Sequence, residues 1–148
     1  MDFKKVVIYT DGGSRGNPGE GAIGVVISDE RGSVIKTYGE RIGICTNNEA
    51  EYKALIFGLK KAKQIIGKDK IKFCEIEVRS DSELLVNQMN GKYKVQDEKI
   101  GKLFLEVWNL RVGLSKINFI AIRRESNKLA DKMVNQAFDS VAKSQKLF

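Results

Sequence analysis

Four acidic residues of the 148-residue chain stand where a strand is expected to end or a helix to begin, and together they could support hydrolytic chemistry. They are Asp11, Glu51, Asp81 and Asp131. The sequence contains no histidine, which excludes a Ser-His-Asp triad, a Cys-His pair and a histidine-ligated zinc site. Proton transfer must therefore use carboxylates, Lys, Tyr, Cys or water on a metal.

Each acid has a structural alternative when it is taken alone. Asp11 in TDG and Asp81 in SDS have the local sequence of turn or capping residues, and Asp131 could be a solvated acid at a helix margin. Glu51 differs because it falls in the middle of an apolar helix face, where an unpaired carboxylate is costly. A buried Lys or Arg partner is the structural alternative for this residue.

Four converging carboxylates would repel one another unless cations neutralised them. Oxygen ligands without histidine or paired cysteines favour Mg²⁺ or Mn²⁺ over Zn²⁺, and two such ions could hydrolyse a phosphodiester. The chain has 26 Lys and Arg against 19 Asp and Glu, a net charge of +7. This balance favours a polyanionic partner, with nucleic acid ahead of a membrane surface.

The hydrophobic pattern predicts an α/β fold that would gather these acids at one sheet edge. The predicted strands are 5–11, 21–28, 33–42, 71–80 and 117–124, with a glycine-rich loop after the first. The predicted helices are 46–66, a short helix capped at Ser80 or Asp81, 97–112 and 126–143. The first three strands form an antiparallel meander, and the crossovers imply parallel pairing of the first, fourth and fifth. Ligands usually bind at the carboxyl edge of such sheets.

The chain is expected to form one domain over residues 1–148, because no linker, repeat or low-complexity stretch divides it. The N-terminus enters a strand directly, without a secretory signal, and no stretch reaches the ~18 apolar residues of a membrane span. A cytoplasmic monomer is therefore expected. Cys45 and Cys74 lack metal or CxxC spacing, so we expect two reduced structural thiols.

Four motifs identify a resemblance to a known family. TDGGSRGNPG (10–19), TNNEAEY (46–52), SDSELLV (80–86) and RESNKLAD (124–131) resemble, in order, the motifs of type 1 ribonucleases H. The resemblance implies a ribonuclease H-like fold, with a five-stranded mixed sheet flanked by helices. It also implies an endonuclease that hydrolyses the RNA strand of RNA/DNA hybrids with two Mg²⁺ ions, or Mn²⁺ in their place, and leaves 5′-phosphate and 3′-hydroxyl ends.

The resemblance also implies a role for each acid. Asp11 would bridge both metals, and Glu51 and Asp81 would serve the metal on the leaving-group side. Asp131 would join Asp11 at the metal on the side of the attacking water. Glu49 matches the capping position of its motif, so no metal is assigned to it.

Ten further positions are expected to contact the hybrid: Gly12, Gly13, Asn17, Asn47, Asn48, Ser82, Glu83, Arg123, Arg124 and Asn127. The two glycines would let the backbone approach a minor groove that displays 2′-hydroxyls. For Asn47 and Asn48, capping of the following helix is the alternative.

The chain departs from the family pattern before the last acid, where many members carry a histidine in a flexible loop. Arg123, Arg124 and Glu125 occupy that region here. We expect an arginine to contact the scissile phosphate or the departing product, with Glu125 as a metal-exchange or proton partner. A simple surface Arg–Glu pair is the alternative.

A second departure is the absence of two features that some members carry. There is no long basic handle between the middle helices, and no additional N-terminal hybrid-binding domain is expected. The remaining lysines of this region form either a reduced phosphate-binding patch or a solvated surface; they are Lys92, Lys94, Lys99 and Lys102.

Other functions remain open on the sequence. One is a relaxed nuclease that also cleaves double-stranded RNA, since both duplexes offer an A-like minor groove with 2′-hydroxyls. Another is a non-catalytic hybrid-binding module, which loss of any of the four acids would have favoured. A strand transferase or Holliday-junction nuclease would share the sheet and the acids, but the TDGGSRGNPG segment argues against it.

Overall fold

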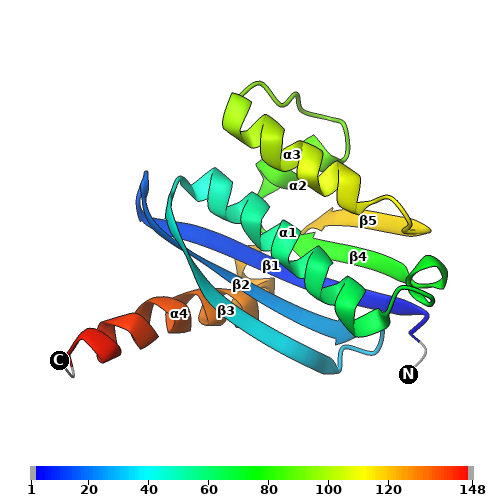
Figure 1. Cartoon of the computed structure of the whole chain (residues 1–148), viewed down its shortest axis with the longest axis horizontal. Helices are drawn as coiled ribbons and strands as arrows, with labels where there is room; N and C mark the ends of the chain where they lie inside the picture. Colours follow the sequence, from blue (N-terminus) through cyan, green and yellow to red (C-terminus); the bar gives the residue numbers. More distant parts are fainter. Residues whose placement is uncertain (1–2, 147–148) are drawn as a thin grey trace.

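The computed structural model describes residues 3–146, with side chains up to residue 140. Its centre is one five-stranded sheet in the order β3-β2-β1-β4-β5 (Figure 1). Strands β1 (Lys5–Gly16), β2 (Gly19–Asp29) and β3 (Val34–Cys45) form the antiparallel meander. Strands β4 (Glu75–Ser80) and β5 (Lys116–Ala121) continue the sheet in parallel with β1. The mixed sheet predicted from the sequence is therefore confirmed.

The glycine-rich loop predicted after residue 11 is wrong, because β1 continues through it. Residues 12–16 pair with β2 as far as Gly16 opposite Gly19, so the turn is confined to residues 17 and 18. Antiparallel pairing satisfies the backbone groups that a loop would leave to water. The sequence DGGSRG therefore forms the end of the β1–β2 hairpin, beyond the residues at which β1 pairs with β4.

Four helices flank the sheet. They are α1 (Asn47–Ile66), α2 (Glu83–Met89), α3 (Glu98–Leu110) and α4 (Lys128–Lys146). Helices α1 and α3 lie side by side over one face, whereas α4 packs on the opposite face against β2 and β3 and extends past them (Figure 1). Only residues 90–97 separate α2 from α3, so the expected absence of a long handle is confirmed.

Two predicted strands are shorter than expected. Residues 71–73 form a 3₁₀ turn in which Phe73 is exposed, and β4 starts only at Glu75. The last strand ends at Ala121, and a second 3₁₀ turn, Arg124–Ser126, precedes α4. Apolar and β-branched residues made both segments resemble strands, but strand length here is set by the pairing partner.

The larger core lies between the sheet and helices α1 and α3. Its fully buried side chains include Ile8, Val25, Ile27, Leu55, Leu59, Ile76 and Val78. A smaller cluster beneath α4 consists of Ala22, Val134, Ala137 and Phe138. Cys45 and Cys74 are buried and free, as expected. Within residues 3–146, no helix has the length and apolarity needed to cross a membrane.

Two glycines let α4 pack directly on the backbone of the sheet. A Cβ atom on Gly24 of β2 would overlap with the Ala130 carbonyl group, and one on Gly39 of β3 would lie 2.5 Å from the Met133 carbonyl oxygen. Any larger residue would therefore push the helix away. This close approach fixes the position of the first turn of α4, which carries Asp131.

Candidate active site

Three of the four predicted acids meet where the parallel pairing of β1 with β4 ends. One carboxylate oxygen from each of Asp11, Glu51 and Asp81 lies within 4.8 Å of the others. Thr10 and Ser80 are the last neighbours in the parallel register, so the two aspartates follow directly after it. The structure thus brings together residues that are 70 positions apart in the chain, as the parallel arrangement predicted.

Glu51 reaches this group because the start of α1 is fixed in place. A capping box closes the helix, with Thr46 Oγ1 accepting from the Glu49 N–H and Glu49 Oε1 accepting from the Thr46 N–H, each at 3.2 Å. A Cβ on Gly12 would overlap with the Ala50 carbonyl group. The missing side chain of Gly12 therefore lets α1 lie against β1, a role that the sequence alone did not indicate.

The Glu51 carboxylate is only partly satisfied by the protein. Its Oε1 atom accepts a hydrogen bond from the Gly12 N–H at 3.3 Å, whereas Oε2 is buried and has no partner among the described residues. No Lys or Arg in that part of the chain forms an ion pair with it. The alternative of a buried basic partner for Glu51 is therefore not supported.

The pKa values of the three acids are raised by burial and by the negative charges of their neighbours. Burial raises the pKa of Asp11 to about 7, and the charges of Asp81 and Asp131 add to the effect. Burial also raises the pKa of Glu51 well above its ordinary value, with Asp11 and Asp81 contributing. For Asp81, burial again raises the pKa, although Arg124 opposes the shift. The group consequently favours a bound cation over three free negative charges.

The donor set fits a hard divalent cation. It offers only oxygen atoms, and one of them, Glu51 Oε2, is buried without a partner in the described part of the chain. Mg²⁺ and Mn²⁺ prefer such ligands, whereas structural zinc sites use sulfur or imidazole. The three acids could therefore hold Mg²⁺ or Mn²⁺.

Asp131 lies at the mouth of the same cleft, outside the tight group. It is exposed on the first turn of α4, and its Oδ2 atom is 3.5 Å from Asn135 Nδ2. The cleft has a volume of about 460 Å³ and is lined by Asp11, Gly12, Gly13, Asn47, Asn48, Glu51, Asp81, Ser82, Arg124, Asp131 and Val134. All four predicted acids thus border one open space.

The predicted asparagines divide between structural and exposed positions. Asn47 Oδ1 accepts from the Ser14 N–H at 2.9 Å, and Asn17 Oδ1 accepts from the Asn47 N–H at 3.0 Å. These bonds tie the β1–β2 hairpin to the start of α1. Asn48 is exposed on the rim of the cleft. The helix itself is capped by Thr46, so capping by Asn47 or Asn48 is wrong.

Ser82, not Ser80 or Asp81, caps helix α2. Its Oγ atom accepts from the Leu85 N–H at 3.2 Å. Ser80 is fully buried, and Asp81 belongs to the acid group, so neither is available at the helix start. Glu83 is exposed in the first turn of this helix and borders an adjoining hollow.

The segment in place of the usual histidine loop forms that hollow. It has a volume of about 540 Å³ and is lined by Asp81, Glu83, Ala121, Ile122, Arg123, Arg124 and Glu125. Arg124 borders both the hollow and the acid cleft. Among the predicted hybrid contacts, only Asn127 lies beneath this surface, where it is 1% exposed.

Comparisons with known proteins agree with this geometry. A family model described as reverse transcriptase-like matches residues 9–137. A bifunctional protein of Mycobacterium tuberculosis is 39% identical over 95% of this chain, although the chain spans only 37% of its length. A ribonuclease H of Caldicellulosiruptor saccharolyticus is 30% identical, with 96% of each chain covered.

A solved structure shows the same fold. LC11-RNase H1 in complex with an RNA/DNA hybrid superposes with a TM-score of 0.88 and 42% identity, covering 93% of this chain and 99% of that one. With its motifs in order and its acids at one sheet edge, the chain belongs to the reverse transcriptase-like family and, within it, to the type 1 ribonucleases H.

Proposed function

We propose that this protein is a divalent-metal-dependent endonuclease that hydrolyses the RNA strand of RNA/DNA hybrids and leaves 5′-phosphate and 3′-hydroxyl ends. The observation that carries the proposal is the Asp11–Glu51–Asp81 group, in which a buried carboxylate oxygen has no partner among the residues that the structure describes. Family membership and the hybrid bound by LC11-RNase H1 support the choice of substrate. We also propose that the chain acts through one catalytic domain.

In this proposal the four acids together bind two cations. Asp11 stands between the others, since the charges of Asp81 and Asp131 both act on it. It would bridge the two ions, with Glu51 and Asp81 on one side and Asp131 on the other. Bound divalent cations supply the Lewis acidity that phosphodiester hydrolysis needs. No histidine is required by such a site.

The cleft also offers groups suited to a ribose-bearing strand. Gly13 has open space where a side chain would stand, with its nearest neighbour, Asn47 Oδ1, 3.9 Å from that point. The Asn48 amide on the rim can both donate and accept hydrogen bonds, as a 2′-hydroxyl requires. We therefore expect Gly13 and Asn48 to contact the RNA strand, together with Ser82, which also lines the cleft, and Glu83, which borders the adjoining hollow.

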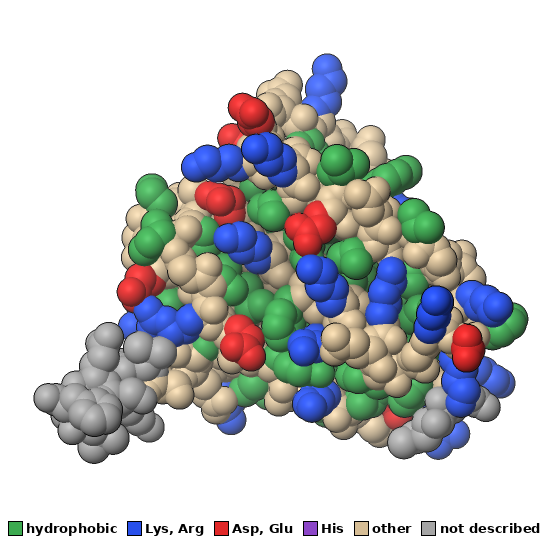
Figure 2. Space-filling model, viewed as in Figure 1, with side chains coloured by type: hydrophobic (Ala, Val, Ile, Leu, Met, Phe, Trp, Pro, Cys, Tyr) green, Lys and Arg blue, Asp and Glu red, His purple; other side chains and the backbone are tan. Residues whose placement is uncertain are grey.

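The positive charge is spread over the surface. Lys and Arg side chains are scattered, with fewer acids between them, over the face formed by α1 and α3 (Figure 2). Lys92, Lys94, Lys99 and Lys102 are all exposed. Such a surface attracts a duplex by many weak phosphate contacts, so hybrid affinity should fall as salt rises.

Asp11→Asn tests the proposal most directly. The substitution keeps the size of the side chain and removes a metal-binding charge, so cleavage of a hybrid in Mg²⁺ should fall about a thousandfold or more. Binding of the hybrid, measured by fluorescence anisotropy, should persist. Wild-type protein without hybrid cleavage in Mg²⁺ or Mn²⁺, or a variant that still cleaves, would contradict the proposal.

The same cleavage assay distinguishes a nuclease specific for RNA/DNA hybrids from one that also cleaves double-stranded RNA. Hybrid, double-stranded RNA and double-stranded DNA of one sequence are digested in parallel by wild-type protein, with Asp11→Asn as the blank. Cleavage of the hybrid alone supports the proposed specificity. Additional metal-dependent cleavage of double-stranded RNA would extend the substrate class.

Arg124 is proposed to contact the scissile phosphate or the departing product. Its guanidinium acts on the Asp81 carboxylate and borders both the cleft and the adjoining hollow. Charge-assisted contacts of this kind contribute about 1.5–3 kcal/mol, so Arg124→Ala should lower kcat/KM about tenfold or more. Arg123→Ala is the matched control, because Arg123 does not border the acid cleft. Equal activity of both variants would mean that Arg124 does not contact the scissile phosphate or the product and is only a surface residue.

A further inference from the structure

Asn127 is buried beneath the acid group and contacts the backbone that carries it. The residue is 1% exposed and directly precedes α4. Its Nδ2 atom donates to the Thr10 carbonyl oxygen at 2.9 Å, and Thr10 is followed by Asp11. The Asn127 side chain also acts on the Asp81 carboxylate, where it opposes the rise in pKa that burial causes. Asn127 is therefore bonded to β1 and lies near the acid that follows β4.

The backbone of Asn127 adds a third connection. Its carbonyl oxygen accepts from the Asp131 N–H at 3.1 Å, and its own N–H donates to the Arg124 carbonyl oxygen at 3.0 Å. The first of these bonds fixes the turn of α4 that carries Asp131. Asn127 thus links the three segments that bear Asp11, Asp81 and Asp131.

The Asn127 side chain is oriented by its donor group. Its Nδ2 atom supplies the donor that the Thr10 carbonyl oxygen accepts. Its Oδ1 atom is left buried without a partner in residues 3–146. An unpaired buried acceptor destabilises a fold by about 1–3 kcal/mol, so this side chain is held by its donor contacts.

We propose that Asn127 is a positioning residue that sets the spacing of Asp11, Asp81 and Asp131, and through it metal affinity and turnover. The inference rests on the proposed metal-dependent nuclease function. It replaces the direct hybrid contact expected from the sequence, because Asn127 is buried and does not line the acid cleft. Groups that orient metal ligands from behind typically change metal affinity or activity about 10–100-fold when removed.

Two substitutions of Asn127 separate positioning from simple support of the fold. Asn127→Ala removes the amide, whereas Asn127→Asp keeps its shape and replaces the donors with acceptors. Asn90→Ala is the matched control, because Asn90 Nδ2 donates to the Phe119 carbonyl oxygen at 3.1 Å, on β5 and away from the acids. All three proteins are compared with wild type below their unfolding temperatures.

The readouts are hybrid cleavage and metal binding without substrate. We expect both Asn127 variants to lose about 10–100-fold in kcat and to bind Mn²⁺ correspondingly more weakly by isothermal titration calorimetry, with KM for the hybrid unchanged. Asn90→Ala should lose stability while keeping wild-type kcat and Mn²⁺ affinity.

Several results would overturn the inference. They are wild-type kcat and Mn²⁺ affinity in both Asn127 variants, a change in KM alone, or an equal loss in Asn90→Ala. If Asn127→Ala does not fold, Asn127→Asp decides, and failure of both to fold would make the residue purely structural. Failure of the proposed function is distinguishable, since wild-type protein would then not cleave the hybrid.

Discussion

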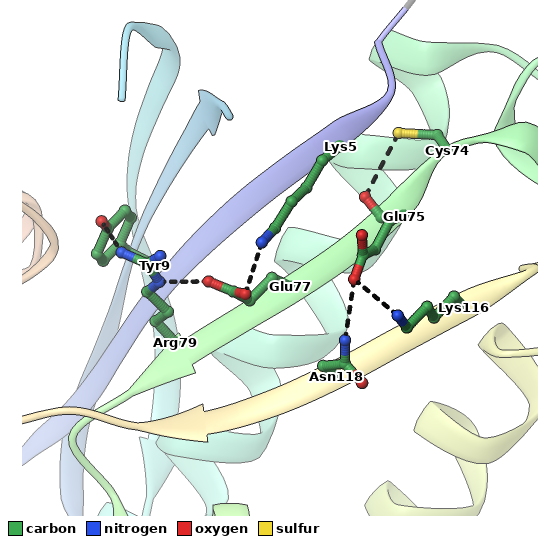
Figure 3. A network of polar contacts seen from close by, with 8 residues as sticks. All are labelled: Lys5, Tyr9, Cys74, Glu75, Glu77, Arg79, Lys116 and Asn118. Atoms are coloured by element: carbon green, nitrogen blue, oxygen red, sulfur yellow. Dashed lines mark hydrogen bonds and ion pairs between the residues drawn. The ribbon is translucent and has the colours of Figure 1, made fainter. Parts of the chain in front are cut away.

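The buried carboxylates of Glu77 and Asp11, on the adjacent strands β4 and β1, have opposite electrostatic environments. Glu77, in the middle of β4, lies between two cations (Figure 3): Lys5 Nζ is 2.9 Å from its Oε1 atom, and Arg79 Nε is 2.6 Å from its Oε2 atom. Arg79 also donates to the Tyr9 hydroxyl at 2.7 Å. Asp81, four residues further along the chain, is not enclosed by two cations and lies with Asp11 and Glu51 where the β1–β4 pairing ends.

Burial alone does not explain the difference. Glu77 is 6% exposed and Asp11 is 9% exposed, so both residues are similarly removed from water. Burial would raise the pKa of Glu77, but hydrogen bonds from Lys5 and Arg79 outweigh it and lower the pKa. For Asp11, burial and two neighbouring acids raise the pKa to about 7. The sheet therefore neutralises Glu77 with its own cations, whereas the group of Asp11, Glu51 and Asp81 would rely on a bound cation in the proposed function.

The largest expected contrast is in turnover. Glu51→Gln removes the carboxylate with the unpaired oxygen and should lower kcat for hybrid cleavage about a thousandfold. Glu77→Gln removes a carboxylate that the protein has already paired and should leave kcat unchanged. Steady-state cleavage in Mg²⁺ measures both variants. Equal losses would mean that the two groups do not differ in function.

A smaller contrast is expected in stability without metal. Asp11 has a raised pKa in the folded state, so its contribution to stability is fully present below its unfolded pKa of 3.8 and is lost as pH rises towards about 7. In chelator at pH 8, Asp11→Asn should therefore be more stable than wild type by about 2–4 kcal/mol. The difference should shrink towards pH 4.

Urea unfolding at several pH values measures this effect. Saturating Mn²⁺ should stabilise wild type and reduce the advantage of the variant, because a ligand that binds only the folded state adds to its stability. An advantage for Asp11→Asn that did not change with pH would contradict an electrostatic origin.

The smallest expected effect is the loss of the paired carboxylate. Glu77→Gln leaves Lys5 and Arg79 without their anion and should destabilise the fold by about 1–2 kcal/mol, discounted because both cations are partly exposed. The lowered pKa of Glu77 places this contribution above its unfolded pKa and removes it as pH falls. The penalty should therefore disappear in acid, as the advantage of Asp11→Asn also should, although the two substitutions change stability in opposite directions. A pH-independent penalty would argue for lost packing instead.

The acids and the sheet could be predicted because each depends on a local pattern. Strand periodicity, crossover lengths and the position of Glu51 on an apolar helix face are visible in the sequence. They were enough to place Asp11, Glu51 and Asp81 at one edge. The capping box of Thr46 and Glu49 was visible for the same reason, since both partners lie within one turn of helix.

The features that were missed depend on contacts between distant segments. Gly12 is adjacent to Asp11 in the sequence, but its role follows from the approach of Ala50, 38 residues away. Asn127 similarly acts on Thr10, 117 positions earlier. The continuation of β1 to Gly16 required knowledge that β2 extends equally far. None of these partners can be read from a short window of sequence.

The close packing of α4 on Gly24 and Gly39 limits the substitutions that this sequence can accept. At these two glycines the helix contacts bare backbone, so no side chain lies between helix and sheet there that could be repacked. The distance from the end of the β1–β4 pairing to Asp131 is therefore set by main-chain geometry. Substitutions of core side chains elsewhere should not change this distance. A single added methyl group at either glycine would disturb this spacing more than many substitutions in the main core.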